Sequence, residues 1–310
     1  MGMIKQRYAR YCNLKLILIF TVIYGHLIED LTDTSYIAEI LYRGIYFVHM
    51  PLFSFMSGLF VKSKKDCSSQ LVKLLKTYIP CQLLAVILSW GRVELFTPWW
   101  HLWYLLSTCI WLAAGWVWLK WGRDSCKTAV ILFCAVLGCA VGFLPRVGRV
   151  MSLSRTAVFL PYFMAGVMSD PRRITEDNKT LAAVCAIVAL ILTVTAGRTI
   201  PTEFLYQAEA YGSNTEVIYR IVCYITGGFA IVAALTFAPN RRYFFTKLGT
   251  DTMPVYLLHA PIVLLVRRLE MDWCLCIPAA AVIIVIIYRI TRWYGGLYRI
   301  TGRPKRGDSG

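Results

Sequence analysis

The chain has 310 residues, of which 58% are hydrophobic and 16% are charged, and its formal net charge is +16. A soluble globular domain is less apolar and more charged, so this composition excludes that class. A strong positive charge can indicate a nucleic-acid-binding protein, but no polar domain here interleaves basic and aromatic residues to form a groove. We therefore expect membrane lipids as partners and no nucleic acid.

Apolar runs separated by short polar gaps recur along the chain. The first run follows a basic stretch but lacks a small-residue cleavage site, so we expect it to be retained as a helix. We predict ten membrane-spanning helices, at 12–28, 44–61, 71–90, 100–119, 128–144, 155–169, 180–197, 216–236, 252–267 and 273–290. The predicted fold class is an all-α integral membrane bundle in one domain, residues 1–300. A basic, Gly-rich tail, residues 301–310, is expected to be disordered.

The basic residues sort by alternate loops, and this sorting predicts the topology. One set of loops and both termini hold 24 of the 33 Lys and Arg residues, among them Lys62, Lys120, Arg172, Arg241 and Arg303. The other loops hold eight: Arg43, Arg92, Arg146, Arg149, Arg155, Arg198, Arg267 and Arg268. The positive-inside rule then places both termini in the cytoplasm, which an even number of spans allows. We expect a multi-pass protein of the cell membrane, specifically of a bacterial plasma membrane.

The four histidines of the chain all lie in or at the edge of predicted spans: His26, His49, His101 and His259. An ionisable side chain inside a membrane helix is costly and usually functional. Imidazole can take and return a proton near neutral pH, so buried proton chemistry is expected. For His49, catalysis and an orienting hydrogen bond remain open alternatives. His101 fits an aromatic belt, and His259 fits a structural role.

Depth along the predicted helices separates two groups of polar residues. Lys15 and His26 are eleven residues apart, about 16 Å along one face of the first helix, with Lys15 near the cytoplasm. His49, His101, Arg155 and Arg220 also fall in the outer half, whereas Lys62, Lys73 and Lys76 mark the inner side. This asymmetry predicts a site reached from both sides of the membrane.

Neither a metal site nor a nucleophile motif is visible in the sequence. The eleven cysteines lie mostly inside apolar runs, where they behave as small hydrophobic residues. No Cys-x-x-Cys pair or Cys/His cluster has metal-ligand spacing. We therefore expect no bound metal and no acyl-enzyme on a serine or cysteine.

Five motifs, in order, carry a family resemblance. They are Lys15-x10-His26, the run Tyr46 to Gly58 that contains His49-Met50-Pro51-Leu52-Phe53, the run His101 to Leu105 around Trp103-Tyr104-Leu105, Ser154-Arg155 to Phe163, and Leu248-Gly249 to His259. Together they resemble acyltransferase family 3, the ten-helix membrane O-acyltransferases, and most closely its fucose 4-O-acetylase-like branch. The resemblance covers residues 10 to about 265.

The resemblance implies functions for several residues. His26 corresponds to the catalytic histidine of the family, and Lys15 to the basic residue that contacts the acyl-CoA donor. An Arg-x-x-Arg element of some members is Lys73-x-x-Lys76 here. Lysine keeps the charge that a phosphate requires but loses the bidentate geometry of arginine.

From these residues we predict an O-acyltransferase, most simply an O-acetyltransferase, with acyl-CoA as co-substrate and no bound cofactor. The assigned roles are catalysis for His26, His49 and Arg155, donor binding for Lys15, Lys73 and Lys76, and acceptor-side contacts for His101, Trp103 and Arg220. The expected acceptor is a hydroxyl of a cell-surface or lipid-linked glycan, which reaches the site from outside.

Two other functions remain open at this stage. A proton-coupled secondary transporter also uses buried histidines and arginines, although no internal repeat relates residues 1–150 to 151–310. A membrane sensing domain is the third alternative. Release of CoA thiol from acetyl-CoA would separate the enzyme from both.

Overall fold

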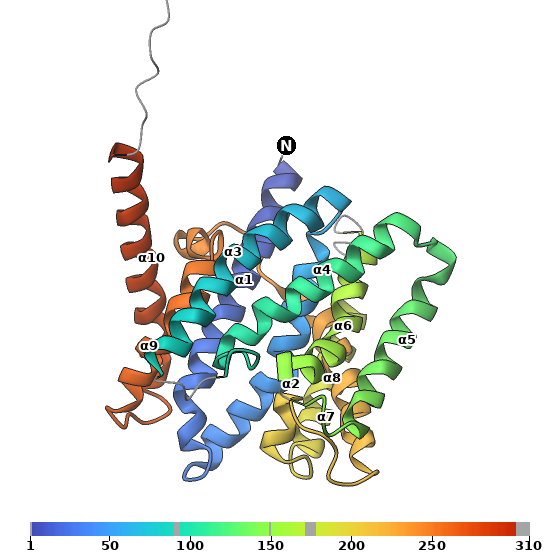
Figure 1. The fold of residues 1–310 in the computed structure, drawn as a ribbon. Helices are drawn as coiled ribbons and strands as arrows, with labels where there is room; N and C mark the ends of the chain where they lie inside the picture. The colour runs from blue at the N-terminus through green and yellow to red at the C-terminus, as the bar shows by residue number, and fades with distance from the viewer. Residues whose placement is uncertain (1, 90–93, 149, 171–177, 302–310) are drawn as a thin grey trace, which may run out of the picture. The chain divides into compact units, whose positions relative to one another are not determined.

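The computed structural model describes residues 2–89, 94–148, 150–170 and 178–301. Within these ranges ten α-helices are joined by turns and short 3-10 helices, and no strand occurs (Figure 1). Their bounds are α1 Gly2–Ile28, α2 Tyr36–Leu59, α3 Lys64–Leu88, α4 Trp103–Trp121, α5 Lys127–Ala140, α6 Leu153–Met168, α7 Lys179–Ala196, α8 Glu216–Phe237, α9 Met253–Arg267 and α10 Cys276–Thr301. Each predicted span overlaps one of these helices, so the all-α prediction is confirmed.

Some sequence-based assignments fall outside the described residues. They are residues 302–310 of the predicted tail and the loop arginines Arg92, Arg149, Arg172 and Arg173.

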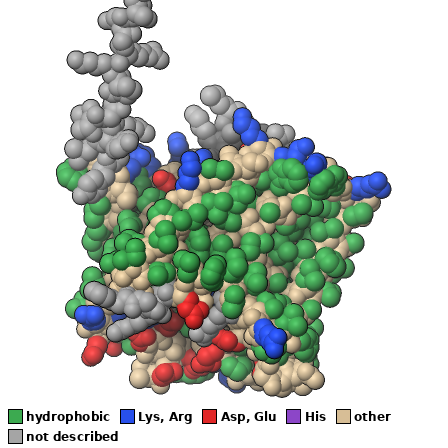
Figure 2. Space-filling view, viewed as in Figure 1, with side chains coloured by type: hydrophobic (Ala, Val, Ile, Leu, Met, Phe, Trp, Pro, Cys, Tyr) green, Lys and Arg blue, Asp and Glu red, His purple; other side chains and the backbone are tan. Residues whose placement is uncertain are grey.

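Eight helices in the described part of the chain are long and apolar enough to cross a membrane, namely α1, α3 to α8 and α10. The other two helices, α2 and α9, do not meet these requirements of length and hydropathy, each for a different reason. The α9 helix has only 15 residues, and α2 contains Arg43, His49 and Pro51, which lower its hydropathy. Hydrophobic side chains spread over α3, α4 and α5 in the view of Figure 2, and little of α3 and α5 is buried within the protein. The protein is thus a multi-pass membrane protein, and these faces suit lipid.

The chain divides into two compact units. Unit 1 comprises residues 1–39 and 238–310, and unit 2 comprises residues 40–237. Unit 1 is discontinuous in sequence, since it joins the first helix to the last two. This arrangement brings motifs from the two ends of the chain into one unit.

In unit 1, α1 packs against α9, α10 and the short 3-10 helix η8 (Phe244–Gly249). Asn13 of α1 holds the segment before η8, because its amide donates to the carbonyls of Pro239 and Arg241, both at 2.9 Å. Thr246 Oγ1 donates to Asn13 Oδ1 at 2.7 Å. A Cβ on Gly249 would lie 1.9 Å from the Cys12 carbonyl oxygen, so this contact requires glycine.

In unit 2, α3 packs on α4, α5 on α6, α7 on α8, and α4 also on α6. The helices α2 and α6 approach each other closely at two glycines. A Cβ on Gly58 would lie 2.0 Å from the Phe163 carbonyl oxygen, and one on Gly166 would lie 2.1 Å from that of Phe55. Small residues at such a crossing let two helix backbones touch, as is common among membrane helices.

The link between α7 and α8 is packed into unit 2. Ile200, Phe204 and Leu205 are buried there and form a hydrophobic cluster with Phe47 of α2. The hydropathy pattern predicts only a loop between two spans here, and it gives no sign that residues of this loop are buried. We call residues 200–211 the buried loop, and it shapes the candidate site of unit 2.

Candidate functional site

The last turn of α1 carries His26 into a cluster of charged and aromatic side chains, all within unit 1. Glu29 Oε2 lies 3.8 Å from His26 Nδ1, which is an ion-pair distance rather than a hydrogen bond. The His259 ring of α9 stacks on the His26 ring, with centroids 5.7 Å apart and planes 18° from parallel. We call His26, Glu29, His259 and Arg267 the His26 cluster. The cluster places His26 of the first motif next to His259 of the last motif.

Arg267, the last residue of α9, holds this cluster together. Its Nε donates to the His26 backbone carbonyl at 2.6 Å, so it satisfies a carbonyl at the C-terminal end of α1. Its Nη2 pairs with Glu29 Oε2, and its Nη1 lies 3.3 Å from Asp30 Oδ1. A guanidinium that binds both the backbone of His26 and the side chain of Glu29 fixes their relative geometry.

The proton position on His259 follows from its hydrogen bond. Its Nδ1 lies 2.6 Å from the Tyr256 carbonyl oxygen. A carbonyl can only accept, so Nδ1 carries the proton and Nε2 is the unprotonated nitrogen of the neutral ring. The His259 side chain is fully buried. A fixed, buried ring against His26 restricts how the His26 imidazole can turn.

Lys15 lies in α1 three turns before His26, as the sequence predicts. Its side chain is half-buried. The other two predicted donor contacts, Lys73 and Lys76, lie in α3 of unit 2, and both are exposed. They are one turn apart on the same helix, so both ammonium groups can meet one anionic ligand.

In unit 2, His49 lies in α2 and is 7% exposed. Its Nδ1 donates to the Ile45 carbonyl at 2.7 Å, which leaves Nε2 as the unprotonated nitrogen of the neutral ring. The Tyr46 ring meets the His49 ring edge-on, with centroids 4.8 Å apart. The observed bond is the orienting kind that the sequence left open, and Nε2 keeps the capacity to accept a proton.

The structure brings the predicted site residues Arg155 and Trp103 together. The Arg155 guanidinium carbon lies 4.9 Å from the Trp103 ring centroid, a cation–π contact. Arg155 Nε donates to the Tyr206 carbonyl at 3.0 Å. Tyr206 in turn packs edge-on against Tyr46, at 5.4 Å between centroids. Through Tyr46 and Tyr206, the buried loop therefore connects Arg155 to the neighbourhood of His49.

Arg220 has no exposed surface, and its guanidinium holds the buried loop. Its Nε donates to Gln207 Oε1 and its Nη1 to the Gly138 carbonyl, both at 2.9 Å. The Tyr211 ring lies 4.7 Å from the guanidinium carbon. Burial raises the pKa of the Tyr211 hydroxyl to about 12, so this group stays protonated and donates to the Cys139 carbonyl. The acceptor-side contact that the sequence predicts for Arg220 stays a prediction.

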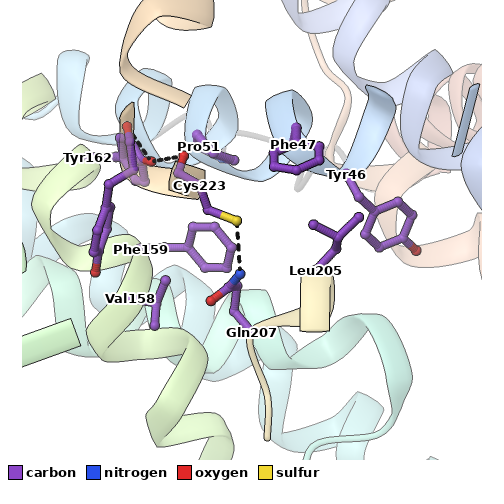
Figure 3. A pocket seen from close by; sticks show the side chains of 10 residues that line it. Tyr46, Phe47, Pro51, Val158, Phe159, Tyr162, Leu205, Gln207 and Cys223 are labelled. Atoms are coloured by element: carbon purple, nitrogen blue, oxygen red, sulfur yellow. Dashed lines mark hydrogen bonds between the residues drawn. The ribbon is translucent and has the colours of Figure 1, made fainter. Parts of the chain in front are cut away.

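A small cavity of about 20 Å³, enough for roughly one water molecule, lies in unit 2 between α2, α6, α8 and the buried loop. Its walls are mainly aromatic and aliphatic, and Gln207 and Cys223 supply polar groups (Figure 3). The Gln207 amide points to Cys223 Sγ across the cavity at 3.5 Å. Tyr162 closes another side and donates to the carbonyls of Cys223 and Tyr224 at 3.2 Å.

His101 lies in the 3-10 helix η2 (Trp100–Leu102) and is 4% exposed. The rings of Trp99 and Trp100 meet it at centroid distances of 5.6 and 6.2 Å. His101 is therefore buried among aromatic rings, and its place in an aromatic belt stays a prediction. Among the described residues, no group of three or more His, Cys, Asp or Glu side chains is placed to hold a metal ion.

Sequence reasoning missed two members of the His26 cluster. Glu29 follows His26 at i+3, a spacing that places both side chains on one helix face, so a local signal existed. Arg267 is 241 residues from His26, and no local signal could have paired them. Gln207 was also missed, because an amide in a loop carries no motif.

Comparison with known proteins supports one family. The family model of acyltransferase family 3, described as an acyltransferase domain, matches residues 12–291. This range takes in nearly all of the helical chain, including the His26 cluster and the buried loop. No curated protein and no solved structure matches the chain. Because the match extends over far more than half of its length, the chain belongs to acyltransferase family 3 and is a membrane acyltransferase.

Proposed function

We propose that the enzyme transfers a short acyl group, most simply acetyl, from acyl-CoA at the cytoplasmic face to a hydroxyl of a cell-surface or lipid-linked glycan. The observation that carries this proposal is the His26 cluster: an imidazole in a membrane helix, next to a carboxylate that an arginine holds in place. In an acyltransferase, such an imidazole is suited to general-base catalysis. The particular likeness to the fucose 4-O-acetylase-like branch stays a prediction.

In the proposed step, His26 removes the proton of the acceptor hydroxyl as its oxygen attacks the thioester carbonyl. A carbon–oxygen bond forms and the carbon–sulfur bond breaks. The CoA thiolate leaves and takes the proton back from the imidazolium, so the products are the ester and CoA thiol. Direct transfer needs no acyl-enzyme, which agrees with the absence of a nucleophile motif in the sequence.

Glu29 and Arg267 act through His26. The Glu29 carboxylate, 3.8 Å from Nδ1, stabilises the imidazolium that forms during the reaction. Arg267 holds the carboxylate and the His26 backbone at once, and the stacked His259 ring limits rotation of the imidazole. These three are positioning residues, as the carboxylate is in a hydrolase triad.

On the donor side, we assign Lys15, Lys73 and Lys76 to the phosphates of acyl-CoA. Lys73 and Lys76 are exposed one turn apart on α3, and an ammonium on a flexible stem can follow a phosphate as a point charge. Lys15, half-buried in α1, lies on the helix that leads to His26. The donor would enter from the cytoplasmic side, to which the loop charges of the sequence assign these lysines.

On the acceptor side, we assign Arg155, Trp103, His101 and Arg220, with His49 as a second proton-handling group. The Trp103 ring and the Arg155 guanidinium, in contact at 4.9 Å, offer an aromatic face and donors of the kind that bind a sugar. Arg155 can also stabilise a developing oxyanion. Arg220 would act through the buried loop, whose Gln207 it holds.

The test is acyl transfer by purified enzyme, measured as CoA thiol released and acylated acceptor formed from a panel of lipid-linked glycans. We expect His26→Ala and His26→Gln to insert and fold but to lose activity by about 10²–10⁴-fold, because the base is gone. Wild-type turnover in either variant would remove His26 from the mechanism. A transporter or a sensing domain would release no thiol in a His26-dependent manner.

A further inference from the structure

The segment between α8 and α9 presents an unusual surface within unit 1 (orange in Figure 1). Phe244 is 94% exposed and Tyr243 is 43% exposed. The basic side chains of Arg241, Arg242 and Lys247 are exposed beside them. We call residues 241–247 the aromatic–basic loop.

The aromatic–basic loop is held by ring packing and hydrogen bonds, although most of its side chains are exposed. Phe245 packs against Tyr243 at 4.9 Å and against Phe244 at 5.1 Å between ring centroids. The Tyr243 N–H donates to Thr246 Oγ1 at 2.8 Å, and Thr246 itself is buried against Asn13 of α1. The side that faces α1 is therefore fixed by hydrogen bonds, and the opposite side is free for a partner.

The exposed side of the aromatic–basic loop combines an apolar ring with basic side chains, and this combination indicates the kind of partner it binds. A fully exposed phenylalanine is unfavourable in water and favourable at the boundary between headgroups and acyl chains. Arginine and lysine next to it are attracted to anionic phospholipids within a Debye length. The loop charges of the sequence assign this segment to the cytoplasmic side, where anionic lipids are usual.

We propose that the aromatic–basic loop docks on the anionic lipid surface of the cytoplasmic leaflet, with Phe244 inserted and Arg241, Arg242 and Lys247 on headgroup phosphates. The loop is bonded to Asn13, two residues before Lys15. Lipid binding therefore secures the cytoplasmic half of α1, the helix that also carries His26. This inference concerns lipid binding and stands independently of the proposed reaction.

The test uses the full-length protein in nanodiscs of neutral phosphatidylcholine with increasing phosphatidylglycerol. Native mass spectrometry counts the retained anionic lipids. Arg241→Ala/Arg242→Ala keeps the Arg241 carbonyl that Asn13 binds, so the fold is preserved. At about 1 kcal/mol for each basic residue near an anionic surface, the double variant should bind the first phosphatidylglycerol about 30-fold more weakly. Phe244→Ser should also weaken retention, because insertion is lost.

The matched control is Lys64→Ala/Lys65→Ala, which removes the same charge from exposed residues at the start of α3, where no exposed aromatic cluster accompanies them. It should weaken phosphatidylglycerol retention less than Arg241→Ala/Arg242→Ala does, because no inserted aromatic side chain holds Lys64 and Lys65 at the headgroups. Equal loss in both double variants would overturn the proposal, because net charge alone would then explain binding. So would unchanged lipid retention in Arg241→Ala/Arg242→Ala together with a raised KM for acyl-CoA, since the loop would then bind donor phosphates.

Discussion

At the residue scale, the contact between His26 and Glu29 allows a test of whether His26 is the base that we propose. Glu29→Gln keeps the shape but removes the charge that faces Nδ1. We expect kcat for acyl transfer to fall about 10- to 100-fold, since a charge-assisted contact to the imidazolium is lost, with KM for acyl-CoA unchanged. Steady-state kinetics at fixed acceptor concentration measures this.

Asp30 provides a matched control for Glu29. It contacts the same Arg267 at 3.3 Å, but its side chain is 66% exposed and no contact to His26 is observed. Asp30→Asn should leave kcat within about twofold, as surface ion pairs contribute little. If the two variants lose activity equally, the ion pairs with Arg267, and not the contact of Glu29 with His26, support the reaction.

Arg220 shows a different use of a buried charge. It has no exposed surface and binds Gln207 and the Gly138 carbonyl. In Arg220→Lys, a single ammonium group replaces the planar guanidinium that donates to two acceptors. The free energy of unfolding should fall by about 2 kcal/mol or more. The thermal midpoint in detergent should fall by several degrees. Arg198→Lys, at an exposed position between α7 and the buried loop, should leave it unchanged.

At the element scale, the crossing of α2 and α6 depends on two glycines. Gly58→Ala places a methyl group 2.0 Å from the Phe163 carbonyl oxygen, so the helices must separate. Overpacking of this kind costs about 1–3 kcal/mol or more. We expect a lower thermal midpoint and poor expression.

Gly44, in the same helix, is the comparison for Gly58. A Cβ there would meet nothing within 4 Å. Gly44→Ala should therefore hold or raise the thermal midpoint, because alanine favours the helix by up to about 1 kcal/mol. A similar fall in both variants would show that helix propensity, not the crossing, governs this region.

The elements were largely predictable, and the packing of the buried loop was not. Apolar runs of membrane length indicate helices because the backbone must satisfy its hydrogen bonds internally in lipid. The buried loop is not a lipid-exposed helix, so this constraint does not apply to it and hydropathy does not predict its packing. It is held by long-range contacts such as Arg220 to Gln207 and Arg155 to Tyr206. Local sequence cannot encode these pairings.

At the scale of the whole molecule, motifs far apart in the chain meet within one unit. Lys15-x10-His26 begins the chain, and the motif that ends in His259 lies more than two hundred residues later, yet the two histidine rings stack. The sequence predicted each histidine in a span, but it assigned His259 a structural role. The contact with His26 makes His259 a neighbour of the proposed base, and the role we propose for His259 is to hold that imidazole in place.

The central claim is that an acyl group moves from a cytoplasmic donor to an acceptor on the other side, and oriented vesicles test it most directly. In sealed inside-out vesicles with a lumenal glycan acceptor, external acetyl-CoA should support His26-dependent transfer, with acylated product in the lumen. Right-side-out vesicles without internal donor should be inactive. Product formed only on the cytoplasmic face would contradict the account, and would leave an acyltransferase that works from one side of the membrane.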